Sequence, residues 1–159
     1  MLNQEPLFPM PQSSETSDDY FTPKWLFDTL GVEFDLDVCC PPEGPLYTPC
    51  KSFFTQESDG LSSDWHGLVW MNPPFSGTTN WINKWIAHGN GIALVPFSRA
   101  RWFSRLWESE ATLVHPRPSD TMFNFIHKGK ETNIFMPVVL AAIGQGKEAN
   151  LDAVGRIRS

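Results

Sequence analysis

Apolar residues in this chain occur in short runs whose spacing alternates between that of strands and that of helices. Residues 32–38 alternate apolar and acidic side chains, which predicts a strand that must end before the prolines at 41 and 42. Leu68 to Met71 is an uninterrupted apolar run, typical of a strand buried on both faces. Further strands are predicted at residues 51–55, 91–97, 111–115, 122–126 and 135–143.

Helices are predicted between these strands. A capping hydroxyl at Thr22 and a proline at the next position precede apolar residues up to Gly31, which predicts a short amphipathic helix. Tryptophan and isoleucine recur at helical spacing from Trp81 until Gly89, and a third helix is predicted over residues 101–110. Strands that alternate with helices predict an α/β fold with a mostly parallel, doubly wound sheet and an antiparallel edge near the end.

The bulk composition predicts one domain. With 159 residues, of which 41% are hydrophobic, the chain can build one core. We expect a flexible arm over residues 1–18, the folded domain over 19–145 and a polar tail over 146–159. No apolar run is long enough to cross a bilayer and the start of the chain lacks a signal-peptide pattern, so we expect a soluble, cytoplasmic protein without membrane partners.

Three cysteines could suggest a metal site, but their spacing does not favour one. Cys39 and Cys40 are adjacent and Cys50 follows ten positions later, which is a poor disulfide framework. His66 invites a zinc interpretation, yet neighbouring cysteines point in different directions and no C-x-x-C pair is present. We therefore expect buried, inert thiols and no metal.

Charge is distributed unevenly along the chain. Residues 1–75 hold two basic and twelve acidic side chains, a balance of −10, whereas residues 76–159 hold ten basic and six acidic ones, a balance of +4. A surface that faces a polyanion would thus belong to the second half, where Arg99, Arg101 and Arg105 cluster. An equally open interpretation is that these arginines form a solvated helix face and that the charges only maintain solubility.

The segment Asn72-Pro73-Pro74-Phe75 follows the buried strand at 68–71, and α/β sheets bind their ligands at the carboxyl ends of strands. The Asn72 side-chain oxygen and the Pro73 carbonyl can accept two hydrogen bonds, and the prolines fix the turn without adding N–H donors. Phe75 offers an aromatic face for a planar group. The alternative is an ordinary Asn-Pro turn with Phe75 packed into the core.

The chain resembles the phage-type, Dam-like DNA N6-adenine methyltransferases, whose catalytic motif is D/N-P-P-Y/F/W. The resemblance runs over about residues 20–143 and depends on an ordered set of segments rather than on the motif alone. These segments are Phe21-Thr22-Pro23, residues 34–38, Asp59-Gly60-Leu61, Asp64-Trp65, residues 69–75, residues 94–97 and Trp102-Phe103.

The resemblance implies a Rossmann-like, S-adenosylmethionine-dependent methyltransferase domain that acts on double-stranded DNA. It implies catalytic roles for the motif residues Asn72, Pro73, Pro74 and Phe75, and cofactor-binding roles for five others. These five are Thr22, Pro23, Asp37, Asp59 and Asp64. Carboxylates at strand ends can accept hydrogen bonds from an amine or ribose hydroxyls, although helix caps or solvated loop acids remain the alternative for the three aspartates.

One departure from many methyltransferases is the segment 39–44, which replaces the glycine-rich turn after the first strand. Two interpretations follow: this proline-rich loop cradles the cofactor through its backbone, or the affinity for the cofactor is modest. Two further alternatives stay open: a methyltransferase that acts on RNA adenine or on a protein glutamine, and a non-catalytic DNA-binding or decoy protein on the same scaffold.

Overall fold

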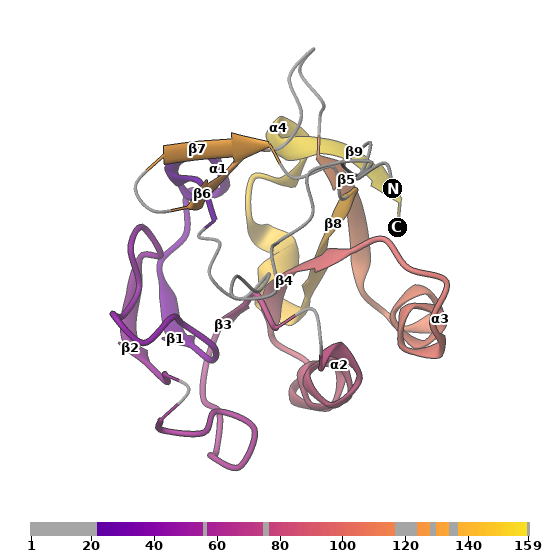
Figure 1. Ribbon diagram of the computed structural model, residues 1–159. Coiled ribbons are helices and arrows are strands. Elements are labelled where there is room, and N and C mark those ends of the chain that lie inside the picture. Colours follow the sequence, from indigo (N-terminus) through magenta and orange to yellow (C-terminus); the bar gives the residue numbers. More distant parts are fainter. Residues whose placement is uncertain are drawn as a thin grey trace, which may run out of the picture.

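A seven-stranded sheet organises the chain (Figure 1). The computed structural model describes residues 22–55, 57–74, 77–116, 124–127, 130–133 and 137–158. The expected arm over 1–18 and the motif residue Phe75 lie outside the described residues. The strands are β1 (Phe34–Asp37), β2 (Cys50–Phe53), β3 (Val69–Met71), β4 (Gly91–Pro96), β5 (Thr112–Pro116), β6 (Asn124–His127), β7 (Lys130–Asn133), β8 (Val138–Ile143) and β9 (Gly155–Arg158). The helices are α1 (Lys24–Leu30), α2 (Thr78–His88), α3 (Arg101–Glu108) and α4 (Leu151–Val154), with a 3₁₀ helix at Gly144–Glu148.

The strand order in the large sheet is β2-β1-β3-β4-β8-β5-β9. Strands β2, β1, β3 and β4 run parallel, β8 runs antiparallel to both of its neighbours, and β9 pairs antiparallel with β5 at the edge. Strands β6 and β7 form a separate antiparallel pair. The expected mixed α/β fold with parallel strands first and antiparallel ones near the end is thus confirmed.

Helices cover both faces of the sheet, as side chains that alternate along the strands require. Met71 packs into a buried cluster with Trp81, Trp85 and other residues of α2 and α3. Trp70, one position earlier, packs into a second buried cluster with residues of α1 and α4. In Figure 1, α2 and α3 lie at the lower right, and α1 and α4 lie at the top. Two cores, one on each face, therefore fix the strands between them.

The last residues differ from the expected polar tail. Leu151 and Val154 of α4 are buried, and β9 is hydrogen-bonded to β5 with Ile157 opposite Val114. Strand β9 is held by main-chain hydrogen bonds to β5, and its last three side chains are exposed. A strand of this kind does not need a run of apolar residues in its sequence. The segment is polar in composition but belongs to the folded sheet.

The connection from β1 to β2 determines where the site lies. These neighbouring strands are parallel, yet residues 38–49 between them contain no helix. Parallel neighbours usually need a crossover of a dozen or more residues that forms a helix. Here the crossover is an irregular loop at the carboxyl end of β1, and it leaves a hollow above the sheet.

Candidate active site

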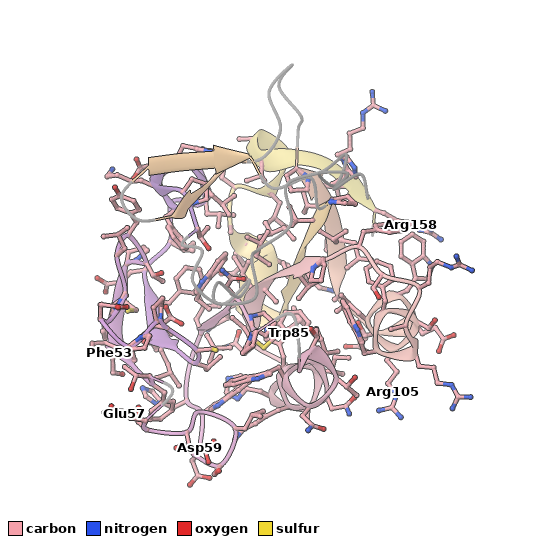
Figure 2. All side chains as sticks on the ribbon, viewed as in Figure 1. Phe53, Glu57, Asp59, Trp85, Arg105 and Arg158 are labelled. Atoms are coloured by element: carbon pink, nitrogen blue, oxygen red, sulfur yellow. The ribbon has the colours of Figure 1, made fainter. Side chains whose placement is uncertain are left out.

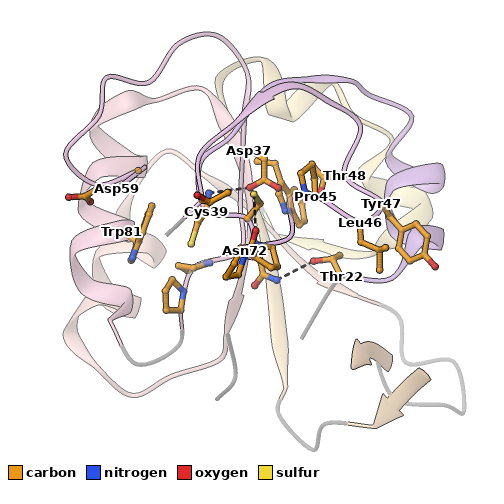
Figure 3. Close-up of a pocket in the computed structure, with 18 residues that line it drawn as sticks. Thr22, Asp37, Cys39, Pro45, Leu46, Tyr47, Thr48, Asp59, Asn72 and Trp81 are labelled. Atoms are coloured by element: carbon orange, nitrogen blue, oxygen red, sulfur yellow. Dashed lines mark hydrogen bonds between the residues drawn. The ribbon is translucent and has the colours of Figure 1, made fainter. Parts of the chain in front are cut away.

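A pocket opens at the carboxyl ends of β1 and β3 (Figure 3). Six residues predicted for the site line it, and they are Thr22, Asp37, Asp59, Asn72, Pro73 and Pro74. Thr22 and residues 72–74 form one side, which we call the strand wall. Residues 39–42, 45–48 and 59–60 form the other, which we call the loop wall. Segments far apart in sequence thus meet where an α/β sheet binds its ligands.

Asn72 is anchored by Thr22. Its amide Nδ2 donates a hydrogen bond of 3.2 Å to the Thr22 hydroxyl, which is itself buried. Because the amide nitrogen faces Thr22, the oxygen Oδ1 points the other way and can accept hydrogen bonds from a ligand. The partner of Asn72 lies 50 positions away in the sequence.

This contact corrects one expectation about α1. Thr22 does not cap the helix, because Pro23 is the N-cap residue and no side chain donates or accepts a capping hydrogen bond there. Extended backbone at Pro23 directs the preceding residue toward the end of β3 instead. Pro23 itself is buried but is not among the residues that line the pocket.

The two prolines shape the turn after β3. The Pro74 carbonyl accepts hydrogen bonds from the Gly77 N–H at 3.1 Å and from the Thr78 hydroxyl at 3.3 Å, which leads directly into α2. Pro73 is buried and lines the pocket as part of the strand wall. Since neither proline has an N–H, the turn adds acceptors without competing donors.

Asp37 is a buried carboxylate at the end of β1. It is only 3% exposed, and its Oδ1 accepts a hydrogen bond of 3.1 Å from the Cys39 N–H. Burial raises the pKa of Asp37 to about 7, while hydrogen bonds from Cys39 and the Thr48 side chain act in the opposite direction. Keeping an acid in such a place costs stability, which is typical of a functional group.

Asp35, two residues earlier, shows the opposite behaviour. It accepts a hydrogen bond of 2.7 Å from the Leu68 N–H and lies 3.4 Å from the Lys51 ammonium. The hydrogen bond from Leu68 lowers the pKa of Asp35, and Lys51 adds to the effect. Asp35 therefore joins two strands as an ionised side chain, whereas Asp37 faces the pocket.

The other two aspartates predicted for the cofactor differ in position. Asp59 lines the pocket, has left-handed backbone with φ of 49°, and accepts a hydrogen bond from the Ser62 hydroxyl. Asp64 is exposed and is not among the lining residues. The structure thus brings Asp59 to the site and leaves Asp64 outside it.

The cysteines of this region are free thiols. Burial raises the pKa of Cys40 to about 12 and that of Cys50 to about 11, which keeps both protonated near neutral pH. Cys39 and Cys40 line the pocket with the proline-rich loop. Within the described residues, no group of three or more His, Cys, Asp or Glu side chains could hold a metal ion.

The arginines predicted to contact DNA lie outside the pocket. Arg99, Arg101 and Arg105 are exposed on and just before α3, and Arg105 donates a hydrogen bond of 2.7 Å to the Asn83 side chain. In Figure 2, Arg105 lies beside α3, whereas Asp59 lies on the loop at the bottom of the view. All three side chains are accessible to solvent, and Arg101 and Arg105 lie one helical turn apart on α3.

Sequence reasoning missed the side chains at the mouth of the pocket. Leu46 and Tyr47 line it and are 48% and 39% exposed, respectively. The signal that could have identified them is a pair of large, mainly apolar residues within a proline-rich loop. Trp81 is buried in the core and also lines the pocket.

These features define a class: α/β enzymes that bind a small ligand at the carboxyl ends of parallel strands. A protein-family model described as DNA N-6-adenine-methyltransferase (Dam) matches residues 11–133. The chain belongs to this family, which confirms the predicted resemblance and the predicted enzyme class, a DNA adenine methyltransferase.

One relative supports the assignment. The DNA N-6-adenine-methyltransferase of Haemophilus phage HP1 (strain HP1c1) is 28% identical over 127 residues, which cover 73% of this chain and 72% of that protein. The comparison with solved structures finds none that matches. Among the described residues, no helix has the length and apolar character needed to cross a membrane.

Proposed function

We propose that this chain transfers a methyl group from S-adenosylmethionine to the N6 amine of adenine in double-stranded DNA, within the pocket between Asn72 and Asp37. The observation that carries the proposal is the hydrogen bond from Asn72 to Thr22, which engages the amide nitrogen and leaves the amide oxygen available as an acceptor in a residue that lines the pocket. Family membership supports the reaction class. Helices on both faces of the sheet support the Rossmann-like, doubly wound arrangement.

The pocket fits the cofactor chemically. It combines carboxylates at Asp37 and Asp59 with apolar side chains such as Leu46 and Tyr47. Carboxylates can accept hydrogen bonds from ribose hydroxyls or an amine, and the apolar rim can cover a flat purine. When bound, S-adenosylmethionine supplies a methyl group activated on a sulfonium.

The strand wall acts on the adenine amine. The lone pair of N6 is delocalised into the ring, so the amine is a poor nucleophile. Oδ1 of Asn72 and the carbonyl of Pro73 each accept one N6 hydrogen, which localises the lone pair on nitrogen. The N–CH₃ bond would form as the bond between the methyl carbon and the sulfonium sulfur breaks, leaving a neutral thioether. The alkylated nitrogen then becomes acidic, and its proton passes to water or a nearby acceptor. Asn72 therefore need not act as a base.

Adenine must leave the duplex to reach this pocket, which costs a few kcal/mol. We propose that Arg99, Arg101 and Arg105 contact the phosphates of the DNA. We also propose that Phe75 stacks against the flipped base. Phe75→Tyr keeps the aromatic ring and should retain methyl transfer. Phe75→Ala removes the ring and should slow single-turnover transfer, because stacking contributes ~1–3 kcal/mol per base. Equal single-turnover rates for the two variants, per folded molecule, would exclude stacking.

Methyl transfer from tritiated S-adenosylmethionine tests the function directly. Duplex DNA, RNA and a glutamine-containing protein are offered in parallel, and the labelled DNA is digested to nucleosides. We expect label in N6-methyladenine from DNA, with none from an adenine-free duplex. Label in RNA or protein alone would establish an alternative acceptor. DNA binding with no label in any acceptor would identify a non-catalytic protein.

A further inference from the structure

A lysine on α2 holds part of the loop wall through hydrogen bonds to its backbone. The Lys84 ammonium donates hydrogen bonds to the carbonyls of Gly60, at 3.4 Å, and Leu61, at 2.7 Å, and also to that of Ser63. It is half-buried, and no acidic side chain in the described part of the chain lies within 4.0 Å of it. Its charge is therefore compensated by backbone dipoles rather than by an ion pair.

The three carbonyls converge because the loop is tightly confined. A Cβ at Gly60 would lie 2.1 Å from the Val38 carbonyl oxygen and 3.1 Å from Trp81, so this residue is pressed between β1 and α2. Trp65 closes the loop by donating its Nε1–H to the Gly60 carbonyl at 2.7 Å. Converging carbonyl oxygens repel one another, and a cation between them offsets that repulsion.

Aromatic contacts hold the ammonium in place. Lys84 Nζ lies 5.0 Å from the centroid of the Trp65 ring. That ring stacks on Trp81 with centroids 6.3 Å apart and planes inclined by 21°. The lysine stem, the two tryptophans and the loop thus form one packed unit whose upper surface, Asp59 and Gly60, lines the pocket.

We propose that Lys84 is a positioning residue that sets the affinity for the cofactor, because it holds Asp59 and Gly60 at the pocket. The inference rests on the proposed function, in which S-adenosylmethionine occupies this pocket. Lys84 contacts the loop wall, whereas the reacting amine is held by Asn72 and Pro73 on the strand wall. Loss of Lys84 should therefore weaken cofactor binding and leave the transfer step nearly unchanged.

Lys84→Met tests this because it keeps the stem and removes the charged donors. We expect the Kd for S-adenosylmethionine, measured by calorimetry, to rise about tenfold or more, as the loss of charge-assisted hydrogen bonds implies. The kcat at saturating cofactor should stay within about twofold of wild type. Lys84→Arg should restore much of the affinity. Lys147→Met, which removes an exposed lysine from the 3₁₀ helix, is the matched control and should bind like wild type.

Hydrogen exchange without cofactor provides a second readout, since amides in residues 57–66 should exchange faster in Lys84→Met than in wild type. If Lys84→Met does not fold, Lys84→Gln replaces it with a neutral donor. An unchanged Kd in a folded variant would overturn the inference and leave the proposed function standing. A loss of kcat as large as the loss of affinity would also overturn it. Wild-type protein that binds no S-adenosylmethionine would overturn both.

Discussion

The two walls of the pocket are built in different ways. The strand wall continues directly from β3, whose three residues are buried and which pairs with β1 and β4. The loop wall contains no strand or helix and is held by isolated contacts, such as the Gly44 N–H to the Pro41 carbonyl and Lys84 to the 60–63 backbone. A strand end holds a reacting group more precisely than a loop does. The strand wall thus suits chemistry, and the loop wall suits ligand affinity.

The largest effect should come from the strand wall. Asn72→Ala removes one of the two acceptors that we propose for the adenine amine, and we expect transfer to fall by at least ~10²-fold. The Kd for S-adenosylmethionine should be nearly unchanged, because in the proposed mechanism Asn72 contacts the adenine base and not the cofactor. Single-turnover rates and calorimetry measure the two quantities. Asn80→Ala, an exposed position on α2, is the control. Near-wild-type transfer in Asn72→Ala would remove this residue from the mechanism.

The loop wall should be sensitive to bulk. Gly60→Ala places a methyl group against the Val38 carbonyl, so we expect the free energy of unfolding to fall by ~1–3 kcal/mol, as overpacking does. Urea denaturation measures the change. Gly77→Ala is the matched control, because nothing lies within 4 Å of a Cβ there. Equal stability of the two variants would contradict the close packing of this loop.

A smaller effect is expected at Thr22, where a substitution can show whether this residue orients Asn72 or binds the cofactor. Thr22→Val removes the partner of the Asn72 amide, so the amide can rotate and kcat should fall about five- to tenfold, the cost of one hydrogen bond of about 1 kcal/mol. Thr22→Ser should retain activity. Thr29→Val, which removes a hydroxyl bonded to the Trp25 carbonyl on α1, is the control. A higher KM for S-adenosylmethionine with unchanged kcat would assign Thr22 to the cofactor instead.

The smallest expected effect concerns Asp37 and pH. The folded-state pKa is raised from 3.8 to about 7, so the folded chain binds this proton more tightly than the unfolded chain does. Stability from Asp37 is therefore greatest at low pH, falls as the pH rises toward 7, and levels off above it. Between pH 6 and 8 the loss should be about 1 kcal/mol.

Urea denaturation across this pH range checks the expectation. Asp37→Asn should lack this part of the pH dependence, whereas Asp35→Asn should keep it, because the pKa of Asp35 is lowered rather than raised. The difference between variants isolates Asp37 from other groups that titrate in the same range. Parallel pH profiles for wild type and Asp37→Asn would show that Asp37 does not bind a proton near pH 7.

The sequence was sufficient to predict that residues 72–74 follow a buried strand at the site, because a buried apolar run followed by Asn72 and prolines is a local pattern. It also predicted α2, which ends at Gly89 with a φ of 71°. The loop wall was predictable only in part. Its support comes from Lys84, more than 20 residues away, and no periodic signal reports such a contact. The anchoring of Asn72 by Thr22 spans 50 positions and was missed for the same reason.

Strand β9 has a consequence for how copies of this protein meet. Among the described residues it is the last strand on its side of the sheet, and an edge strand offers unpaired backbone to any neighbouring chain. Arg156 and Arg158 are exposed along it, and the Arg158 guanidinium lies 3.9 Å from the centroid of the Trp107 ring. Two such edges would bring four positive charges together. We therefore expect the arginines of β9 to oppose aggregation through this edge by charge repulsion.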